Sequence, residues 1–250
     1  MANLLTVPPL LTVQPPLAAG GDALASAAAA CRAGNGEVGA FYLSDDLSLL
    51  DLAVVLGPEV EPRRCWEMLF LTAVAFGDTV GAIAPPEMAV HYRWPDRLLI
   101  NGAGVGRVRL AMAADLDKEG TPHWLAIGLK VRVQPDDEGA EPGVYLDRTT
   151  LANEGAVELT VIDWAEAFAR HFLVWIHSWE ESGFKRIHEI WWGRHDPKAE
   201  SFTWQQEGKS RSGRPFGLDE HGSLLVQEEG AAMTLVQPGS LLGPQGELAG

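Results

Sequence analysis

The sequence predicts an α+β protein with one largely antiparallel sheet flanked by helices, followed by a small β domain at the C-terminal end. Apolar residues recur at helical spacing over residues 62–85 and 163–179, which indicates two amphipathic helices. Residues 124–133 instead place alternate apolar side chains on one face, as a strand does. The pair Asn101 and Gly102 suits a type I′ turn, and such turns join antiparallel strands.

Composition divides the chain into four segments. Residues 1–21 carry two proline pairs, which disfavour helix, and they are expected to form an extended lead-in. Residues 22–196 hold nearly all the periodic segments and are expected to form the main domain. Residues 197–216 are rich in Ser, Gly and charge, so they are interpreted as a polar linker. Short apolar runs separated by turns predict a small β-barrel-like appendage over residues 217–250.

The main domain is expected to begin with a helix and a hairpin. Asp22 is a suitable N-cap for the alanine-rich residues 23–32, and Gly34 is a suitable stop. Residues 40–43 and 49–56 are apolar and flank turn-forming residues, which predicts two strands.

The rest of the main domain supplies more strands and then helices. Alternating residues 88–93 and the residues on both sides of the Asn-Gly pair, 98–111, predict a strand and a hairpin. Asp163 is expected to cap the long aromatic helix, and Gly183 to separate it from a second helix over residues 184–192.

Charge and cysteine content narrow the class of protein. The net charge of −15 opposes binding to nucleic acid or to an anionic membrane surface, so neither partner is expected. Cys31 and Cys65 are too few for a disulfide framework and lack metal-ligand spacing, which favours a reducing compartment. The first 30 residues contain no Lys or Arg, and no later uncharged run is long enough to span a bilayer. We therefore expect a cytoplasmic protein.

Two sequence patterns match part of a known motif but lack the structural order or the second residue that the motif requires. Gly34, Gly36 and Gly39 match the dinucleotide-binding fingerprint, but they follow a predicted helix and precede a strand, which is the reverse of the required order. They are interpreted as a tight connection or as a loop over a ligand. His188 opens a metalloprotease-like pattern, yet Trp192 stands where the second zinc ligand is needed, so no metal site is expected.

A group of basic residues departs from the acidic character of the chain. Arg107 and Arg109 lie two apart on one predicted strand, and Lys130 and Arg132 lie two apart on another, so each pair projects from one face. One interpretation is a pocket for a carboxylate or phosphate, because arginine offers forked, charge-assisted donors to such oxygens. The other is a solvated sheet face, which is common in antiparallel sheets.

Residues 92–102, Tyr-Arg-Trp-Pro-Asp-Arg-Leu-Leu-Ile-Asn-Gly, resemble the signature of the biotin protein ligases. That signature reads Lys-Trp-Pro-Asn-Asp, then apolar residues, then a small turn with Gly. Residues 126–131, 150–151 and 216–226 are similar to further segments of the family in the same order, so the resemblance covers residues 30–242. It implies a class II synthetase-like α/β core with a small SH3-like C-terminal domain.

The resemblance to biotin and lipoate protein ligases also implies a reaction. Such enzymes use ATP and Mg²⁺ to activate a small carboxylic acid to an acyl-adenylate, and pass the acyl group to a lysine of a carrier domain. Biotin, lipoate or a related acid is the implied substrate, no protein-bound metal is required, and the implied partners are a biotinyl or lipoyl carrier domain and a second copy of the chain. Adenylate formation needs cations beside the carboxylate and the α-phosphate, and a loop that excludes water. The ligand-binding candidates are Arg93, Trp94, Pro95, Asp96, Asn101, Gly102, Arg107, Arg109, Gly128, Lys130 and Arg132, and the candidate covering loop contains Gly34, Asn35, Gly36 and Gly39.

Several positions depart from the family pattern. Arg93 stands where the signature has its first Lys, and Asp96 and Arg97 replace the Asn-Asp pair. Gly104 falls where the lysine after the turn is expected, and Arg132 lies near the position of a family Asn. Arginine keeps the charge of lysine but changes the geometry of its donors.

Three functions stay open at this point. The leading hypothesis is an atypical acyl-adenylate-forming ligase in which Arg107, Arg109 and Lys130 supply substitute charge. The second is a relative that binds a small carboxylic acid or a carrier protein without adenylation, motivated by the missing lysine and by the acid in loop 34–39. The third is a structural or interaction module whose tryptophans form an interface.

Overall fold

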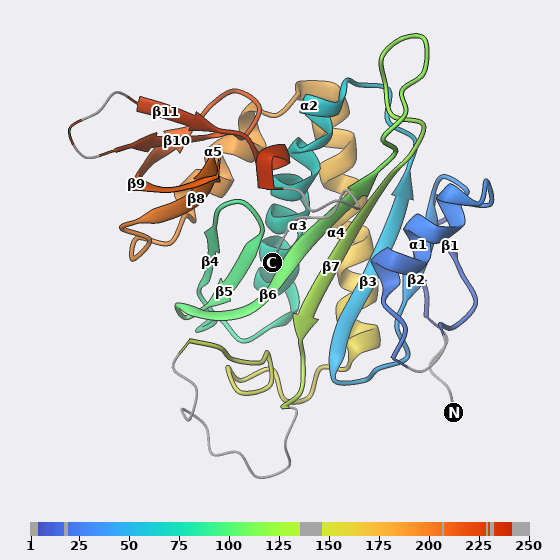
Figure 1. The fold of residues 1–250 in the computed structure, drawn as a ribbon. Helices are drawn as coiled ribbons and strands as arrows, with labels where there is room; N and C mark the ends of the chain where they lie inside the picture. Colours follow the sequence, from blue (N-terminus) through green and yellow to red (C-terminus); the bar gives the residue numbers. More distant parts are fainter. Residues whose placement is uncertain are drawn as a thin grey trace.

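The computed structural model contains a seven-stranded sheet and a separate four-stranded sheet (Figure 1). The structure describes residues 5–17, 20–135, 147–206, 208–228, 230 and 233–241. Strand order in the large sheet is β1-β2-β3-β7-β6-β5-β4, and every neighbouring pair is antiparallel except β1 and β2. Its strands are β1 (Thr12–Val13), β2 (Ala40–Leu43), β3 (Leu49–Leu56), β4 (Val90–Arg93), β5 (Arg97–Ile100), β6 (Ala103–Met112) and β7 (Leu125–Arg132). The prediction of a largely antiparallel sheet is confirmed.

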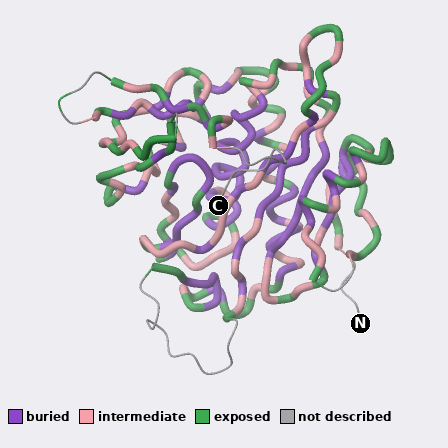
Figure 2. Tube along the Cα trace, in the orientation of Figure 1, coloured by how far each residue is buried: buried purple, intermediate pink, exposed green. Residues whose placement is uncertain are grey.

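Helices cover the two faces of the large sheet unequally. One face packs against α3 (Glu67–Ile83) and α4 (Val161–Ser182), and α2 (Pro62–Cys65) and α5 (Lys185–Gly193) pack against α3 to complete the main core. The other face carries α1 (Ala23–Arg32), whose alanines pack on β2, β3, β6 and β7. Figure 2 shows buried chain along the central strands and the helices behind them. Part of the second face lies beyond α1, and the basic side chains gather there.

Helix α3 is buried on nearly all sides because it lies inside the core. The stretch Pro62–Ile83 is long and apolar enough to cross a membrane, but 78% of its apolar window is buried within the protein. Packing against the sheet, α4 and α5 therefore accounts for its apolar character.

The predicted cap of α1 and the predicted turn at residues 101–102 are correct, and the predicted cap of α4 is wrong. Asp22 caps α1 by accepting a hydrogen bond from the Ala25 N–H at 2.8 Å. Asn101 and Gly102 have φ of 52° and 88° and form the two-residue turn between β5 and β6, as a type I′ turn requires. Asp163 is not the N-cap of α4. Thr160 occupies that position, and the Asp163 carboxylate completes a capping box three residues later.

The small sheet corrects the predicted domain boundary. It contains β8 (Phe202–Gln206), β9 (Lys209–Leu218), β10 (Leu224–Gln227) and β11 (Met233–Val236), and a short helix follows at Pro238–Leu241. Residues 197–216, predicted to be a linker, thus contain β8 and most of β9. These strands bury few side chains, Trp204 among them at 4% exposure, so their sequence lacks the apolar alternation of a strand. The predicted lead-in likewise contributes β1 to the large sheet.

Candidate functional site

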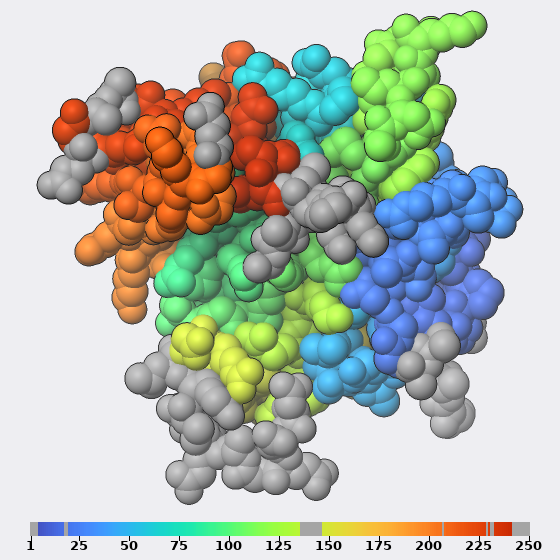
Figure 3. All heavy atoms as spheres, in the orientation of Figure 1, coloured from blue at the N-terminus to red at the C-terminus, as the bar shows by residue number. Residues whose placement is uncertain are grey.

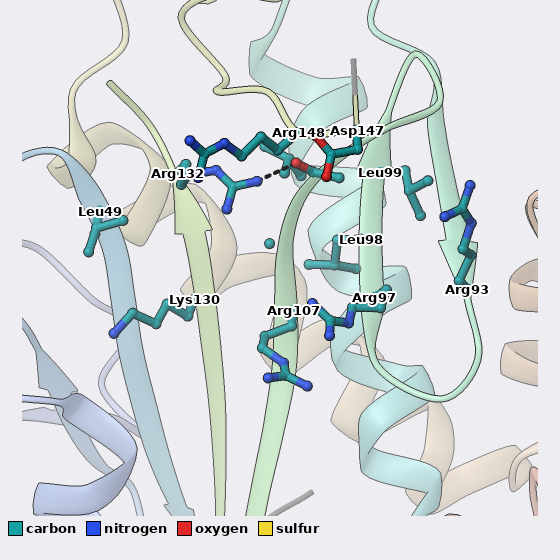
Figure 4. Close-up of a pocket in the computed structure, with 13 residues that line it drawn as sticks. Leu49, Arg93, Arg97, Leu98, Leu99, Arg107, Lys130, Arg132, Asp147 and Arg148 are labelled. Carbon is teal, nitrogen blue, oxygen red and sulfur yellow. Dashed lines mark hydrogen bonds between the residues drawn. The ribbon is translucent and has the colours of Figure 1, made fainter. Parts of the chain in front are cut away.

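A cavity of about 720 Å³ lies on the open face of the large sheet, opposite α3 and α4. Six of the residues that line it are basic, and Asp147 is acidic. In Figure 4 one group of basic side chains lies side by side across neighbouring strands, and Arg132 and Arg148 lie together near Asp147. We call this the basic cavity, and its lining is Leu49, Arg93, Arg97, Leu98, Leu99, Gly104, Val105, Gly106, Arg107, Lys130, Arg132, Asp147 and Arg148.

Sheet register explains why the basic side chains converge. Lys130 pairs with Arg107 across β7 and β6, Arg107 pairs with Arg97 across β6 and β5, and Arg97 pairs with Arg93 across β5 and β4. Directly opposite residues of antiparallel strands project from the same face, with Cβ atoms roughly 5 Å apart. Four basic residues therefore form one row across four strands, and we call them the cation row.

Three carboxylates form ion pairs with the cation row, one at each end and one with Arg107 between them. Lys130 Nζ lies 3.0 Å from the carboxylate of Asp51, its partner on β3. Arg107 donates through Nε and Nη2 to Asp96 Oδ2 at 2.9 and 2.7 Å.

A third carboxylate contacts the far end of the row. Arg93 Nε lies 2.6 Å from Asp196, whose side chain is 2% exposed. These carboxylates fix the cations in place, and basic residues still outnumber acidic ones around the basic cavity.

Burial and ion pairing shift the pKa of two carboxyl groups in opposite directions at the α1 end of the basic cavity. Burial raises the pKa of Asp51, although Lys130 partly offsets this effect. Burial would also raise the pKa of Asp22, but hydrogen bonds from Arg109 and from the Ala25 N–H prevail and lower it to about 2. The Asp22 carboxylate is therefore charged near neutral pH, and both carboxyl groups lie beside the neighbouring cations.

The four basic residues predicted to converge do not all line the basic cavity. Arg107, Lys130 and Arg132 do, but Arg109 lies further along β6 and donates to both oxygens of Asp22 at 2.5 and 2.6 Å. Because Asp22 caps α1, this ion pair fastens the helix to the sheet. Arg109 thus has a structural role and does not line the basic cavity, and its part in ligand binding stays a prediction.

Arg132 lies at the other end of the basic cavity and donates hydrogen bonds to two backbone carbonyl groups. Its Nη2 donates to the Gly104 carbonyl, and its Nε donates to the Thr149 carbonyl at 3.1 Å. The Gly104 N–H donates in turn to the Asp147 carbonyl at 3.0 Å, which brings residues 147–149 across the end of β6. Asp147 and Arg148 reach the site by this path, and no sequence signal marked them.

Trp94 and Pro95 belong to the turn between β4 and β5 rather than to the lining. Trp94 is 5% exposed and contacts the small sheet, whereas Asp96 is 5% exposed and binds Arg107 behind the basic cavity. Within this turn, Asp96 therefore supports the site from outside the lining, and Trp94 faces the small sheet.

The other candidates from the signature also have structural roles. The Asn101 side chain accepts from the Ala89 N–H at 3.0 Å and donates to Glu154 at 2.6 Å, which braces the Asn101-Gly102 turn. Gly128 lies beneath α1, where an added Cβ would come within 3.1 Å of Leu24 Cβ. Neither Asn101, Gly102 nor Gly128 lines the basic cavity.

The candidate covering loop lies away from the basic cavity. Gly34, Asn35 and Gly36 follow the C-terminal end of α1, and Gly36 packs so closely on Cys31 that an added Cβ would lie 2.4 Å from Sγ. Gly39 borders a second cavity, of about 640 Å³. The structure does not place this loop over the predicted ligand site.

Metal ligands do not gather in the part of the chain that the structure describes. Across those residues no three His, Cys, Asp or Glu side chains are arranged to hold a metal ion. His188 contacts the Leu218 carbonyl at 3.3 Å, at the junction with the small sheet.

Fold and sequence comparisons define the class of protein. A biotin protein ligase-like protein of unknown function from Silicibacter sp. TM1040 is 33% identical, with a TM-score of 0.79 that covers 94% of this chain and 97% of that one. Biotin protein ligase from Aquifex aeolicus, in complex with biotin and ATP, has a TM-score of 0.66 at 16% identity and covers 91% and 96% of the two chains. The chain thus has a biotin protein ligase fold.

Sequence comparison identifies the family. Residues 7–193 match the Biotin/lipoate A/B protein ligase family, and the chain belongs to it. The Biotin--[acetyl-CoA-carboxylase] ligase of Paracoccus denitrificans is 22% identical over 174 residues, which is 70% of this chain and 72% of the relative. The family resemblance carried by residues 92–102 is confirmed.

Proposed function

We propose that this chain is a ligase that activates a small carboxylic acid with ATP in the basic cavity and transfers the acyl group to a lysine of a carrier domain. The observation that carries the proposal is the cation row, which provides a concentrated positive surface on a chain of net charge −15. Family membership supports it. So do the fold relatives, which include a ligase from Leishmania major in complex with biotinyl-5-AMP.

The proposed reaction gives the cations a defined task. A carboxylate oxygen of the acid attacks the α-phosphorus of ATP, the bond between the α-phosphorus and the bridging oxygen breaks, and pyrophosphate leaves. The carrier lysine amine then attacks the acyl carbon, loses a proton, and AMP leaves. Arg107 and Lys130 would neutralise the approaching anions, and Arg132 would bind oxygen atoms at the other end of the basic cavity. Mg²⁺ bound to the triphosphate would offset its charge.

A second candidate function is supported by Gly104. This residue lines the basic cavity without a side chain, at the position where the family resemblance implies a lysine. An added Cβ would meet the Asp147 carbonyl at 3.2 Å, so the residues that cross β6 fit closely over the glycine. A chain that binds a small carboxylic acid or a carrier protein without adenylation would retain the basic cavity and need no lysine there.

ATP–pyrophosphate exchange with biotin, lipoate and octanoate separates the two functions. We expect exchange with at least one acid, and a loss of roughly tenfold or more in Arg107→Met, because one charged donor to the transition state is removed. Arg186→Met is the matched control, since Arg186 stacks on Trp175 far from the basic cavity. Absence of exchange together with calorimetric binding of an acid would favour the second function. Absence of both would exclude the first function and leave only carrier-protein binding from the second.

A further inference from the structure

The turn between β4 and β5 is shared by the two sheets of the molecule. Trp94 is buried against the small sheet, where its Nε1 donates to the Gly222 carbonyl at 2.9 Å. Its ring meets Phe202, the first residue of β8, edge-on with centroids 5.1 Å apart. In the space-filling view the C-terminal sheet lies directly against the segments that carry α2 to β5 (Figure 3). Trp94 therefore links the turn to the small sheet by one hydrogen bond and one aromatic contact.

The residues on either side of Trp94 face the basic cavity. Arg93 and Arg97 line it, and the Asp96 carboxylate binds Arg107 through two donors. The Asp96 carbonyl also accepts a hydrogen bond from the Val108 N–H at 2.8 Å, which ties the turn to β6. A displacement of Trp94 would thus move two members of the cation row directly and a third through Asp96.

The small-sheet side of this contact is firmly seated. Gly222 lies in the turn between β9 and β10 with φ of 86°, and an added Cβ there would lie 2.3 Å from the ring of Phe70 in α3. The neighbouring His221 bonds through Nδ1 to Glu67 at 2.9 Å, and Glu67 is 1% exposed. The carbonyl that receives the Trp94 N–H is therefore held by the core of the large domain.

We propose that Trp94 is a positioning residue through which the small sheet sets the geometry of the basic cavity. The hydrogen bond to Gly222 and the contact with Phe202 fix the turn, and the turn places Asp96, which orients the Arg107 guanidinium. Arg93 and Arg97 take their positions from the same turn. This inference rests on the proposed function, because it assigns the basic cavity to anion binding. It adds the small sheet to the parts of the molecule that determine affinity.

Trp94→Phe tests the inference, because it keeps a ring against Phe202 and removes the donor to Gly222. The control is Trp204→Phe. Trp204 is 4% exposed in the small sheet, and its hydrogen-bond and ring partners are Gln206, Phe202 and Arg211, none of which belongs to the turn. Phe202→Leu weakens the same contact from the other side and serves if Trp94→Phe does not fold.

The first measurement needs no ligand. The Arg107 Nε–H resonance in ¹H–¹⁵N NMR reports its hydrogen bond to Asp96, and we expect it to shift or exchange faster with solvent in Trp94→Phe and to stay unchanged in Trp204→Phe. An unchanged Arg107 signal in Trp94→Phe, or equal changes in both variants, would overturn the inference whatever the basic cavity binds.

The second measurement is calorimetric titration with pyrophosphate. We expect the Kd to rise roughly fivefold in Trp94→Phe and to stay within about twofold of the parent in Trp204→Phe, although both variants lose thermal stability. A purely structural role would lower the Tm of Trp94→Phe and leave its Kd unchanged, which contradicts the inference. If the parent protein binds no pyrophosphate while the Arg107 signal still responds, the proposed function fails and the positioning role of Trp94 stands.

Discussion

Asp22 joins three interactions at a single side chain. It accepts the Ala25 N–H as the N-cap of α1, receives both donors of Arg109, and lies 3.6 Å from Lys130 Nζ. Capping needs only an oxygen acceptor, whereas the contacts with Arg109 and Lys130 need negative charge. The two contributions of Asp22 can therefore be separated by substitution.

Asp22→Asn should keep the cap and remove the charge, and Asp22→Ala should remove both. We expect a loss of about 1–2 kcal/mol in the free energy of unfolding at pH 7 for Asn, after allowing for solvent screening at a side chain that is 32% exposed. Ala should lose about 1 kcal/mol more. Urea unfolding of the two variants and the parent measures both differences. Equal stability of the Asn and Ala variants would contradict a role for the cap.

The charge contribution of Asp22 should depend on pH. Its pKa in the folded protein is about 2, against 3.8 for the unperturbed group, so its stabilising contribution is complete above pH 4 and is lost as the pH falls toward 2. Burial shifts the pKa of Asp51 upward, so that group favours the folded protein as the pH falls. The difference between parent and Asp22→Asn reports Asp22 together with its effect on the pKa of Asp51, and it should shrink between pH 4 and pH 2. A difference that is constant across this range would exclude the ion pair as its cause.

At the scale of single residues, local chemistry was predictable and partners distant in the sequence were not. Asp22 as a cap follows from the alanine-rich residues after it. Its pairing with Arg109, 87 positions away, depends on where α1 packs on the sheet. Asp147 and Arg148 reach the site through backbone contacts with Gly104 that no side-chain pattern encodes.

Gly106 in β6 packs so closely against β7 that there is no room for a side chain. An added Cβ at residue 106 would lie 2.2 Å from the Lys130 carbonyl and 2.8 Å from Val131 Cα. Both neighbours are backbone atoms of the paired strand, which cannot move without displacing Lys130 from the cation row. Gly106 thus maintains the spacing of two strands of the basic cavity.

Gly106→Ala should lower the free energy of unfolding by about 2–4 kcal/mol, because the strands must separate to admit the methyl group. The control variant should change the free energy of unfolding in the opposite direction. Gly81 lies in α3 with open space where a Cβ would stand, so Gly81→Ala should stabilise the protein by about 0.5–1 kcal/mol. Denaturant unfolding of both variants checks the pair of signs. A stable Gly106→Ala protein would show that the two strands can separate at no cost.

At the scale of elements, the sequence predicted strands that bury one apolar face and missed those that do not. Residues 124–133 alternate strictly and form β7 within one residue at each end. The register that aligns Arg97, Arg107 and Lys130 follows from the Asn-Gly turn together with a bulge between Leu98 and Leu99, and the bulge has no sequence signal. β8 and β9 were not predicted as strands, because polar residues lie on both faces of these strands and no apolar alternation marks them.

At the scale of the whole molecule, one turn of the small sheet carries three of the contacts that join it to the large domain. Asp219 pairs with Arg63 at 2.9 Å, His221 with buried Glu67, and Gly222 packs against Phe70. Three successive anchors on α2 and α3 thus hold the small sheet. This arrangement makes the stability of the whole molecule sensitive to the size of residue 222.

Gly222→Ala should destabilise the protein more than an equivalent change in a free turn. Gly222 and Gly208 both have positive φ, of 86° and 73°, so alanine at either position is strained by roughly 1 kcal/mol. Only at residue 222 does the methyl group also meet the Phe70 ring, at 2.3 Å. We expect Gly222→Ala to lose about 2 kcal/mol more than Gly208→Ala. Urea unfolding with hydrogen exchange over residues 209–227 measures the difference, and equal losses would mean that the junction tolerates a side chain.

The family and the main core were predictable from the whole sequence, but the relation of the two sheets was not. Residues 92–102 carry the family signature, and the helix periodicity of residues 62–85 marks the core. The contact of Trp94 with Gly222 joins positions 128 residues apart, and its Trp-Pro motif was interpreted as part of the ligand site. A buried aromatic residue looks the same in sequence whether it faces a ligand or another sheet.

The cation row places like charges directly opposite one another on adjacent strands, an arrangement that weakens a sheet by mutual repulsion. Asp51 and Asp196 relieve part of that repulsion at the two ends of the row, and Asp96 relieves part of it at the two middle residues, but all four basic residues also line the open cavity. An anion that occupies the cavity therefore also acts as an electrostatic clamp on four strands. If the basic cavity binds an anion as proposed, binding and the stability of the sheet are thermodynamically linked, so the ligand should raise the free energy of unfolding.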